Sequence, residues 1–254
     1  MQTKWQYLPG MLVLLCALMM LMHGAIPQYA HYHAFADTAS YWQIPNAMDV
    51  LSNLAFAIIG LLGLLAVWTH FSQQANPWRP KDVAYTVFVI SILATSVGSF
   101  FYHLAPDDSR LFWDRLPIAL ACASLIAAVR ADALNTRTWS IAVRDLTVLL
   151  VFAIVSVLWW QRTGDLRPYL ALQVLAILLI PIWQTIYPTP RQTRWVYACA
   201  IGLYVLAKIT ETHDAAILLQ TGFISGHTIK HLLASGAAAV IIWHWLHSSR
   251  HQLT

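Results

Sequence analysis

Long apolar runs, separated only by short polar connectors, recur along the whole chain. They occupy residues 8–26, 47–68, 83–104, 116–129, 146–160, 168–186, 195–209 and 228–246. About 20 helical residues cross a bilayer core, and lipid offers no partner to a backbone N–H or C=O, so runs of this length predict helices and not barrel strands. The sequence therefore predicts an all-α fold, a polytopic transmembrane helix bundle with eight spans.

Composition agrees with this prediction. Of the 254 residues, 59% are hydrophobic and only 10% are charged, whereas soluble domains carry roughly 25% charged residues. The net charge of +4 comes from Lys and Arg residues scattered through the connectors, and these form no basic stripe of the kind that binds nucleic acid. We therefore expect the protein to reside in a lipid bilayer and not to bind nucleic acid. The three cysteines show no C-x-x-C spacing and predict no disulfide.

The positive residues also predict an orientation, because cytoplasmic connectors are enriched in Lys and Arg. On the more positive side of the predicted topology lie Lys4, Arg79, Lys81, Arg130, Arg137, Arg144, Arg191, Arg194 and Arg250. The other side holds Arg110, Arg115, Arg162 and Arg167, with Lys208 and Lys230 near helix ends. We expect both termini in the cytoplasm of a bacterium and the protein in its inner membrane. The run at 8–26 is expected to be an uncleaved span, although a cleaved signal peptide is the alternative.

Three histidines stand at the ends of two distant runs. His227 and His231 are four residues apart, so on a helix their imidazoles project from one face with about 5 to 6 Å between Cβ atoms. His103 adds a third nitrogen from another helix. Three protein ligands and one open position are typical of catalytic zinc, although iron, copper and nickel also bind imidazole. We predict a zinc site; the alternative is that the histidines are interfacial residues hydrogen-bonded to water.

Two further polar residues accompany His103 in sequence. Ser99 precedes it by one helical turn, and Asp114 lies just before the next run, 116–129. Asp114 could act as a general acid and base, and Ser99 could donate a hydrogen bond to an oxyanion. The alternatives are a Ser99 hydroxyl bonded to the carbonyl of residue i−4, and an Asp114 that caps its helix or pairs with Arg110 or Arg115. On the predicted topology all five residues lie at the outer, periplasmic side.

The passages that carry these residues resemble the alkaline ceramidase family, within the CREST superfamily that includes the adiponectin and progestin receptors. They are VGSFFYHLAPDDSRLFWDRLP at 97–117, SGHTIKHL at 225–232 and IPNAMDVLSNLAF at 44–56. The resemblance implies that His103, His227 and His231 are zinc ligands. It also implies that Asp114 is the acid and base and that Ser99 is the transition-state donor.

The resemblance further implies a domain organisation and an activity. Residues 1–43 would form an extra N-terminal transmembrane helix and an outer loop, 44–247 a seven-helix catalytic membrane domain, and 248–254 a cytoplasmic tail. The activity would be a zinc-dependent hydrolase of linear amide C–N bonds. Its substrate would be ceramide or a similar N-acyl lipid, cleaved to a fatty acid and a long-chain amine. The alternatives are a zinc-containing receptor or lipid sensor with little turnover and, third, a haem carrier, which no C-x-x-C-H motif supports.

Two other polar rows remain open in their interpretation. The resemblance to the eukaryotic ceramidases would also imply an acidic calcium-binding stretch before the core, but Asp37, Trp42, Asn46 and Asp49 offer too few carboxylates here to predict calcium. Asn46, Asp49 and Asn53 share a helix face and either make capping and interhelical hydrogen bonds or support the metal site. The second row is Lys208, Glu211 and Asp214, in which Lys208 and Glu211 are expected to form an ion pair in preference to contacting substrate.

Overall fold

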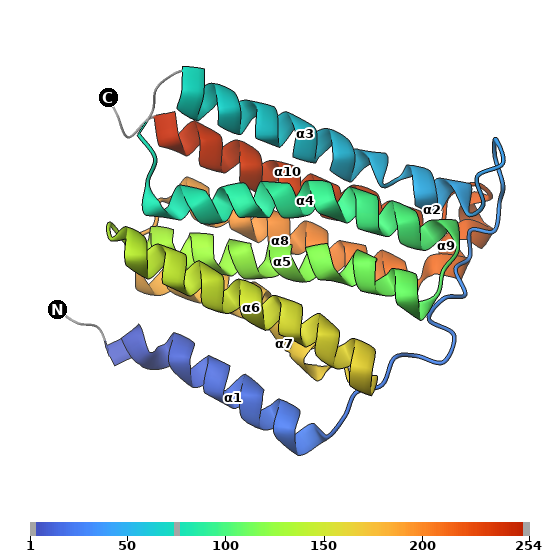
Figure 1. Ribbon diagram of the computed structural model, residues 1–254, viewed down its shortest axis with the longest axis horizontal. Coiled ribbons are helices and arrows are strands. Elements are labelled where there is room, and N and C mark those ends of the chain that lie inside the picture. Colours follow the sequence, from blue (N-terminus) through green and yellow to red (C-terminus); the bar gives the residue numbers. More distant parts are fainter. Residues whose placement is uncertain (1–3, 74–76, 251–254) are drawn as a thin grey trace. The chain divides into compact units, whose positions relative to one another are not determined.

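The computed structural model describes residues 4–73 and 77–250, and most of these are helical (Figure 1). The α-helices are α1 (Leu8–His23), α2 (Ala47–Leu51), α3 (Leu54–Trp68), α4 (Pro80–Leu104), α5 (Asp108–Ala133), α6 (Trp139–Thr163), α7 (Arg167–Ile186), α8 (Arg191–Thr212), α9 (Asp214–Thr221) and α10 (Gly226–Arg250). A 3-10 turn at Lys4–Tyr7 and a π-helical turn at Thr69–Gln73 complete the helical structure. No β-strand occurs among the described residues, which confirms the predicted all-α class.

Seven helical segments of the described chain are long and apolar enough to cross a membrane. They are Trp5–His23, Ala47–Ser72, Pro80–Leu104, Asp108–Ala133, Trp139–Thr163, Arg167–Ile186 and Gly226–Ser248. The remaining predicted span, 195–209, lies in α8, which is helical throughout but is not among the seven. Charged residues near both ends of α8, including Arg194 and Glu211, lower its mean hydropathy. The protein is an integral membrane protein of the polytopic helical class.

The chain divides into two compact units. Unit 1 comprises Met1–Gln28, Pro77–Phe88 and Ala119–Tyr197, and unit 2 comprises Tyr29–Asn76, Val89–Ile118 and Ala198–Thr254. All five predicted site residues belong to unit 2. These two units are groups of residues that contact one another and are not the domains predicted from the sequence. The predicted division into 1–43, 44–247 and 248–254 stays a prediction. Residues 248–250 of the predicted tail continue α10, and 251–254 lie outside the described residues.

In unit 1, α1 packs against α7 (Figure 1), and the short connector before α7 anchors the chain that leaves α1. Asp165 Oδ1 accepts hydrogen bonds from the backbone N–H groups of Ile26 and Arg167, at 3.1 and 3.0 Å. Asp165 also forms an ion pair with the Arg167 guanidinium. Partial burial raises the pKa of the Asp165 carboxyl, but these donors lower it by more, so that it lies well below its usual range.

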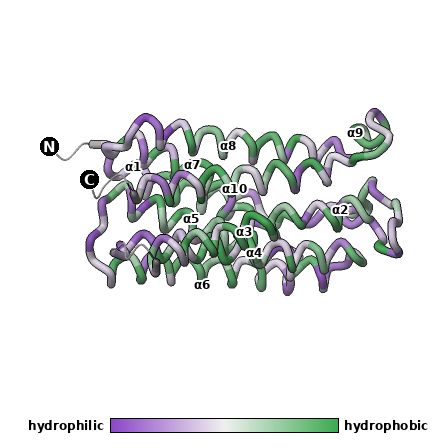
Figure 2. The backbone as a smooth tube through the Cα atoms, turned by 90° about the horizontal axis from the view of Figure 1, so that it is seen from above, coloured by the Kyte–Doolittle hydropathy of each residue, from purple (hydrophilic) through white to green (hydrophobic). Residues whose placement is uncertain are grey.

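In unit 2, α3 packs along α10 (Figure 1) and closely approaches α4. A Cβ atom added at Gly60 would lie 2.8 Å from Leu93 Cα, so the two helix backbones touch at this glycine. Small residues allow such approaches in lipid, where packing replaces the hydrophobic driving force. Figure 2 shows hydrophobic residues through the middle of α3 and hydrophilic residues around α2. The α2 end of this unit is therefore its more polar end.

The helix that begins unit 2 is interrupted between α2 and α3, at Ser52 and Asn53. Ser52 Oγ donates to the Asp49 carbonyl at 2.9 Å, and Asn53 Nδ2 donates to the same carbonyl at 2.9 Å. Side chains that bond to nearby carbonyls compete with the helical hydrogen bonds, which explains the interruption. The interruption lies beside the start of α10, which α2 contacts.

Candidate metal centre

The three predicted histidines come together in unit 2. His103 lies in the last turn of α4, while His227 and His231 lie in the first turns of α10. One ring nitrogen from each lies within 4.8 Å of the others, and the Nε2 atoms of His227 and His103 are 3.2 Å apart. Two nitrogens bound tetrahedrally to one zinc ion at about 2.0–2.1 Å would be about 3.3 Å apart. An N–H···N hydrogen bond also fits the 3.2 Å pair, but it does not account for the convergence of the third ring.

The burial of these rings decides against the interfacial alternative. His103, His227 and His231 are 1%, 4% and 3% exposed, so their rings are not hydrated at a membrane surface. Imidazole nitrogens without thiolates form a donor set that suits zinc and other transition metals. The residues present therefore fit a divalent metal ion.

Ser52 fixes the orientation of the His231 ring. Its Oγ lies 2.7 Å from His231 Nδ1, and its single hydrogen is already donated to the Asp49 carbonyl. His231 Nδ1 must therefore carry the hydrogen of this contact, which leaves Nε2 with its lone pair free to bind a metal. Metal-binding histidines commonly donate their second ring N–H in this way.

Replacing Ser52 by alanine should lower metal affinity by about 10- to 100-fold, the range observed when such an outer hydrogen bond is lost. The reason is that His231 would then be free to rotate or to change tautomer. Competition between the purified variant and a chelator of known affinity measures the change. Ser52→Thr retains the hydroxyl and serves as the matched control; an unchanged affinity in Ser52→Ala would show that Ser52 does not orient the ring.

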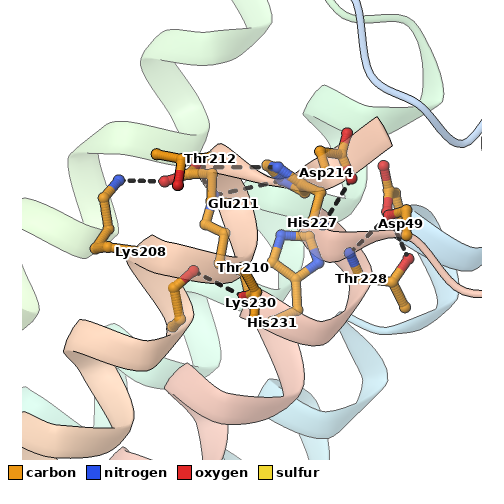
Figure 3. Close-up of polar contacts among 12 residues, drawn as sticks. Asp49, Lys208, Thr210, Glu211, Thr212, Asp214, His227, Thr228, Lys230 and His231 are labelled. Atoms are coloured by element: carbon orange, nitrogen blue, oxygen red, sulfur yellow. Dashed lines mark hydrogen bonds and ion pairs between the residues drawn. The ribbon is translucent and has the colours of Figure 1, made fainter. Parts of the chain in front are cut away.

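Carboxylates anchor the start of α10. Asp214 Oδ1 accepts the backbone N–H of His227 at 2.8 Å, and Asp214 Oδ2 accepts that of Ala36 at 2.9 Å. Asp49 Oδ1 accepts a hydrogen bond from the Thr228 hydroxyl at 2.6 Å (Figure 3). It accepts another from the Ser225 hydroxyl at 3.0 Å. Negative groups are favourable at a helix N-terminus, where N–H groups lack partners. Asp49 thus makes an interhelical contact that supports the helix carrying two of the histidines.

The other two polar residues of the predicted row, Asn46 and Asn53, bond to backbone carbonyls. Asn46 Nδ2 donates to the His103 carbonyl at 2.8 Å, which ties the end of α4 to the start of α2. Asn53 bonds to carbonyls of its own turn. Asp37 accepts the N–H groups of Ala39, Met48 and Asp49 and so caps α2.

Asp114 and Ser99 lie together where α4 and α5 cross. Gly98 permits this crossing, because its Cα packs directly on the Trp113 carbonyl. The Ser99 hydroxyl approaches the Asp114 carboxyl without meeting hydrogen-bond geometry, and it bonds to no carbonyl, so the alternative interpretation of Ser99 is wrong. The capping alternative for Asp114 is also wrong, since α5 begins six residues earlier at Asp108. Asp114 is buried and interacts electrostatically with Lys230.

A cluster of alternating charge lies beside the histidines in Figure 3. Lys208 and Glu211 of α8 form the predicted ion pair, which is confirmed. Glu211 also binds Lys230 of α10, with 2.6 Å between Nζ and Oε1, a contact that the spacing in the sequence does not predict. Glu211 lies outside the seven membrane-spanning segments. Burial raises the pKa of its carboxyl, but Lys230 and Lys208 lower it by more, to about 2. Glu211 is therefore ionised at neutral pH.

An aromatic residue that sequence reasoning also missed covers two of the histidines. The Phe35 ring lies 4.7 Å from the His103 ring and 4.5 Å from the His227 ring, between centroids. Its segment is held by His33, whose Nδ1 lies 2.9 Å from Tyr102 Oη and whose Nε2 lies 3.1 Å from Asp108 Oδ1. No local pattern in the sequence marks this loop, because its contacts depend on residues about 70 positions away.

Comparison with known proteins identified no related protein. No protein-family model matches the chain, and a search of curated proteins found no significant match. The fold and the site therefore define the class of this protein: a polytopic helical membrane protein with a buried three-histidine cluster that could hold a metal ion.

Proposed function

We propose that the chain is a zinc-dependent amidohydrolase of the membrane that cleaves the N-acyl bond of ceramide or a similar lipid. The single observation that carries the proposal is the convergence of His103, His227 and His231 within 4.8 Å, in a buried setting. Zinc held by three imidazoles lowers the pKa of a bound water and polarises a carbonyl group. The products would be a free fatty acid and a long-chain amine.

Two residues of the chain would handle the proton and the developing charge. The Asp114 carboxylate would accept a proton from the attacking water and return it to the leaving nitrogen. The Ser99 hydroxyl is buried beside Asp114 and makes no hydrogen bond of good geometry, and it would donate to the carbonyl oxygen of the substrate. Their proximity at the crossing of α4 and α5 supports these roles.

The substrate class rests on the resemblance to alkaline ceramidases together with the location of the site. His103, His227 and Asp114 all lie near the ends of helices that are able to span a bilayer. A site at that depth would reach the amide linkage of a lipid whose tails stay in the membrane. We place it at the periplasmic side of a bacterial inner membrane, as the distribution of Lys and Arg predicts.

The test is product analysis on the purified, zinc-loaded protein with ceramide and other N-acyl amine lipids. Wild-type protein should release fatty acid and amine in equal amounts. Asp114→Asn should lower turnover by about 10²- to 10⁴-fold, the usual contribution of a general acid and base, while its zinc content stays unchanged because Asp114 is not one of the clustered ligands. Equal turnover in wild type and Asp114→Asn would exclude the assigned role, and no turnover by wild type on any such lipid would exclude the function.

A zinc-containing receptor or lipid sensor is the second candidate, and one observation favours it. The Phe35 ring packs on His103 and His227, which restricts access to two of the three rings. A sensor would bind an N-acyl lipid stoichiometrically and release no fatty acid. The same product analysis therefore separates a sensor from a hydrolase.

A further inference from the structure

We propose that Lys230 is a catalytic residue whose ammonium donates a hydrogen bond to the substrate carbonyl oxygen as that oxygen gains negative charge. This inference rests on the proposed hydrolase function and adds a residue to it. Neither the three-histidine pattern nor the resemblance assigns a role to Lys230.

Lys230 points toward the histidine cluster. It lies on α10 between His227 and His231, and its Nζ is 3.3 Å from His227 Nε2. Its side chain is only 18% exposed. A lysine that is largely shielded from solvent in a membrane-spanning helix is costly and usually faces a functional interior. The position of Lys230 therefore needs a reason beyond solubility.

A count of hydrogen-bond donors gives such a reason. An ammonium group has three N–H donors. Glu211 Oε1 takes one at 2.6 Å, and the only other acceptor that the described residues offer is His227 Nε2. A ring nitrogen whose lone pair binds a metal cannot also accept a hydrogen. With a metal ion bound there, Lys230 would therefore keep at least one N–H without an acceptor among the described residues, and the oxygen of a bound amide would supply one.

Electrostatics distinguishes this role from that of a structural ion pair. A positive charge close to a metal-ligand nitrogen opposes the binding of a dication. An ion pair that only joined α8 to α10 could lie elsewhere along the two helices, where it would not repel a bound metal ion. A cation at this position is favourable when negative charge develops beside it, which is the situation at an amide carbonyl under attack.

Glu211 would act as a positioning residue for Lys230. Lysine has a flexible four-carbon stem, and a catalytic donor must be held in place before the reaction. Glu211 lies between the ammonium groups of Lys208 and Lys230 and bonds to both. Its carboxylate thus limits the movement of Lys230 while leaving the other donors of the ammonium free.

The experiment compares wild type, Lys230→Met, Lys230→Arg and the control Lys81→Met. Lys81 is a matched control because it is a buried lysine of a helix that forms an ion pair with Asp132, in unit 1. Two quantities are measured on each protein. One is the zinc affinity of the metal-free protein, by competition with a chelator. The other is kcat and KM with the N-acyl lipid that wild type hydrolyses best.

Lys230→Met should lower kcat by about 10²- to 10³-fold, the usual effect of losing one oxyanion donor, with KM changed less than about threefold. Its zinc affinity should rise, on the order of tenfold, because a repelling charge is removed. Lys230→Arg should recover part of kcat. Lys81→Met should leave kcat, KM and zinc affinity as in wild type.

Two results would overturn the inference while leaving the hydrolase function intact: an unchanged kcat in Lys230→Met, or a zinc affinity that falls, as loss of a purely structural pair would produce. If Lys230→Met does not fold, Lys230→Gln provides the same two measurements. A wild-type protein that binds zinc but cleaves no N-acyl lipid would instead reject the proposed function, and the role of Lys230 with it.

Discussion

Replacing His231 with alanine is expected to remove the bound metal from the purified protein and to abolish hydrolysis of N-acyl lipids. The remaining nitrogens of His103 and His227 would leave a two-ligand site, and zinc sites use at least three protein ligands. Affinity should fall by more than the roughly 100-fold that loss of an outer hydrogen bond can cause. Elemental analysis of metal per protein chain and assay of released fatty acid measure the two effects.

The control for this variant is His247→Ala, which removes a histidine from the same helix. His247 stacks on Trp243 and contacts its carbonyl, and it is not part of the metal-binding cluster. Its zinc content and turnover should match those of wild type. Full zinc content in His231→Ala would show that the cluster is not the metal site, and full activity would exclude the mechanism.

The membrane helices follow from the sequence because hydropathy is a local property. Apolar runs predicted α1, α4, α7 and α10 closely, whereas the run at 116–129 predicted a span shorter than α5. The first turn of α5 is polar, so hydropathy does not predict that it is helical. This turn is stabilised by Asp107. Asp107 Oδ1 accepts the Ser109 hydroxyl and the Arg110 N–H, and these hydrogen bonds lower the pKa of the Asp107 carboxyl. A capping interaction, not apolarity, sets where this helix begins.

The site was only partly predictable, and for a physical reason. The spacing of His227 and His231 is local, so helix geometry alone places both rings on one face. The partner of His231 is Ser52, 179 residues earlier in the chain, and no periodicity relates the two. The sequence shows that Lys230 lies between the two histidines. Its ion pair with Glu211 of another helix cannot be read from the sequence. Local patterns predicted the histidines of the cluster, whereas the groups that orient them are set by helix packing.

The packing of α4 on α5 gives the second large prediction, which is that Gly98→Ala should disrupt the site without changing any polar residue. A Cβ atom at position 98 would lie 2.0 Å from the Trp113 carbonyl oxygen, far inside van der Waals contact. Backbone atoms cannot rotate away as a side chain can, so the two helices must separate. Overpacking costs about 1 to 3 kcal/mol and occasionally more.

Separation would act directly on the proposed chemistry, because Ser99 follows Gly98 and Asp114 follows Trp113. A displacement of about 1 Å at reacting groups can lower turnover about 100-fold. We therefore expect Gly98→Ala to lose at least that much activity and to unfold at a lower temperature in detergent, as measured by tryptophan fluorescence. Zinc content should be less affected than in His231→Ala, since the ligands on α10 keep their anchors at Asp49 and Asp214.

Gly236→Ala is the matched control, because Gly236 also lies within a helix of unit 2 but has no atom within 4 Å of an added Cβ. There the substitution should be neutral or raise stability by up to about 1 kcal/mol, since alanine favours helix more than glycine does. If Gly98→Ala behaved like Gly236→Ala in both melting temperature and turnover, close contact between α4 and α5 would not be what holds Ser99 and Asp114 together. Their proximity would then have to be maintained from elsewhere in unit 2, and the crossing at Gly98 would carry no functional constraint.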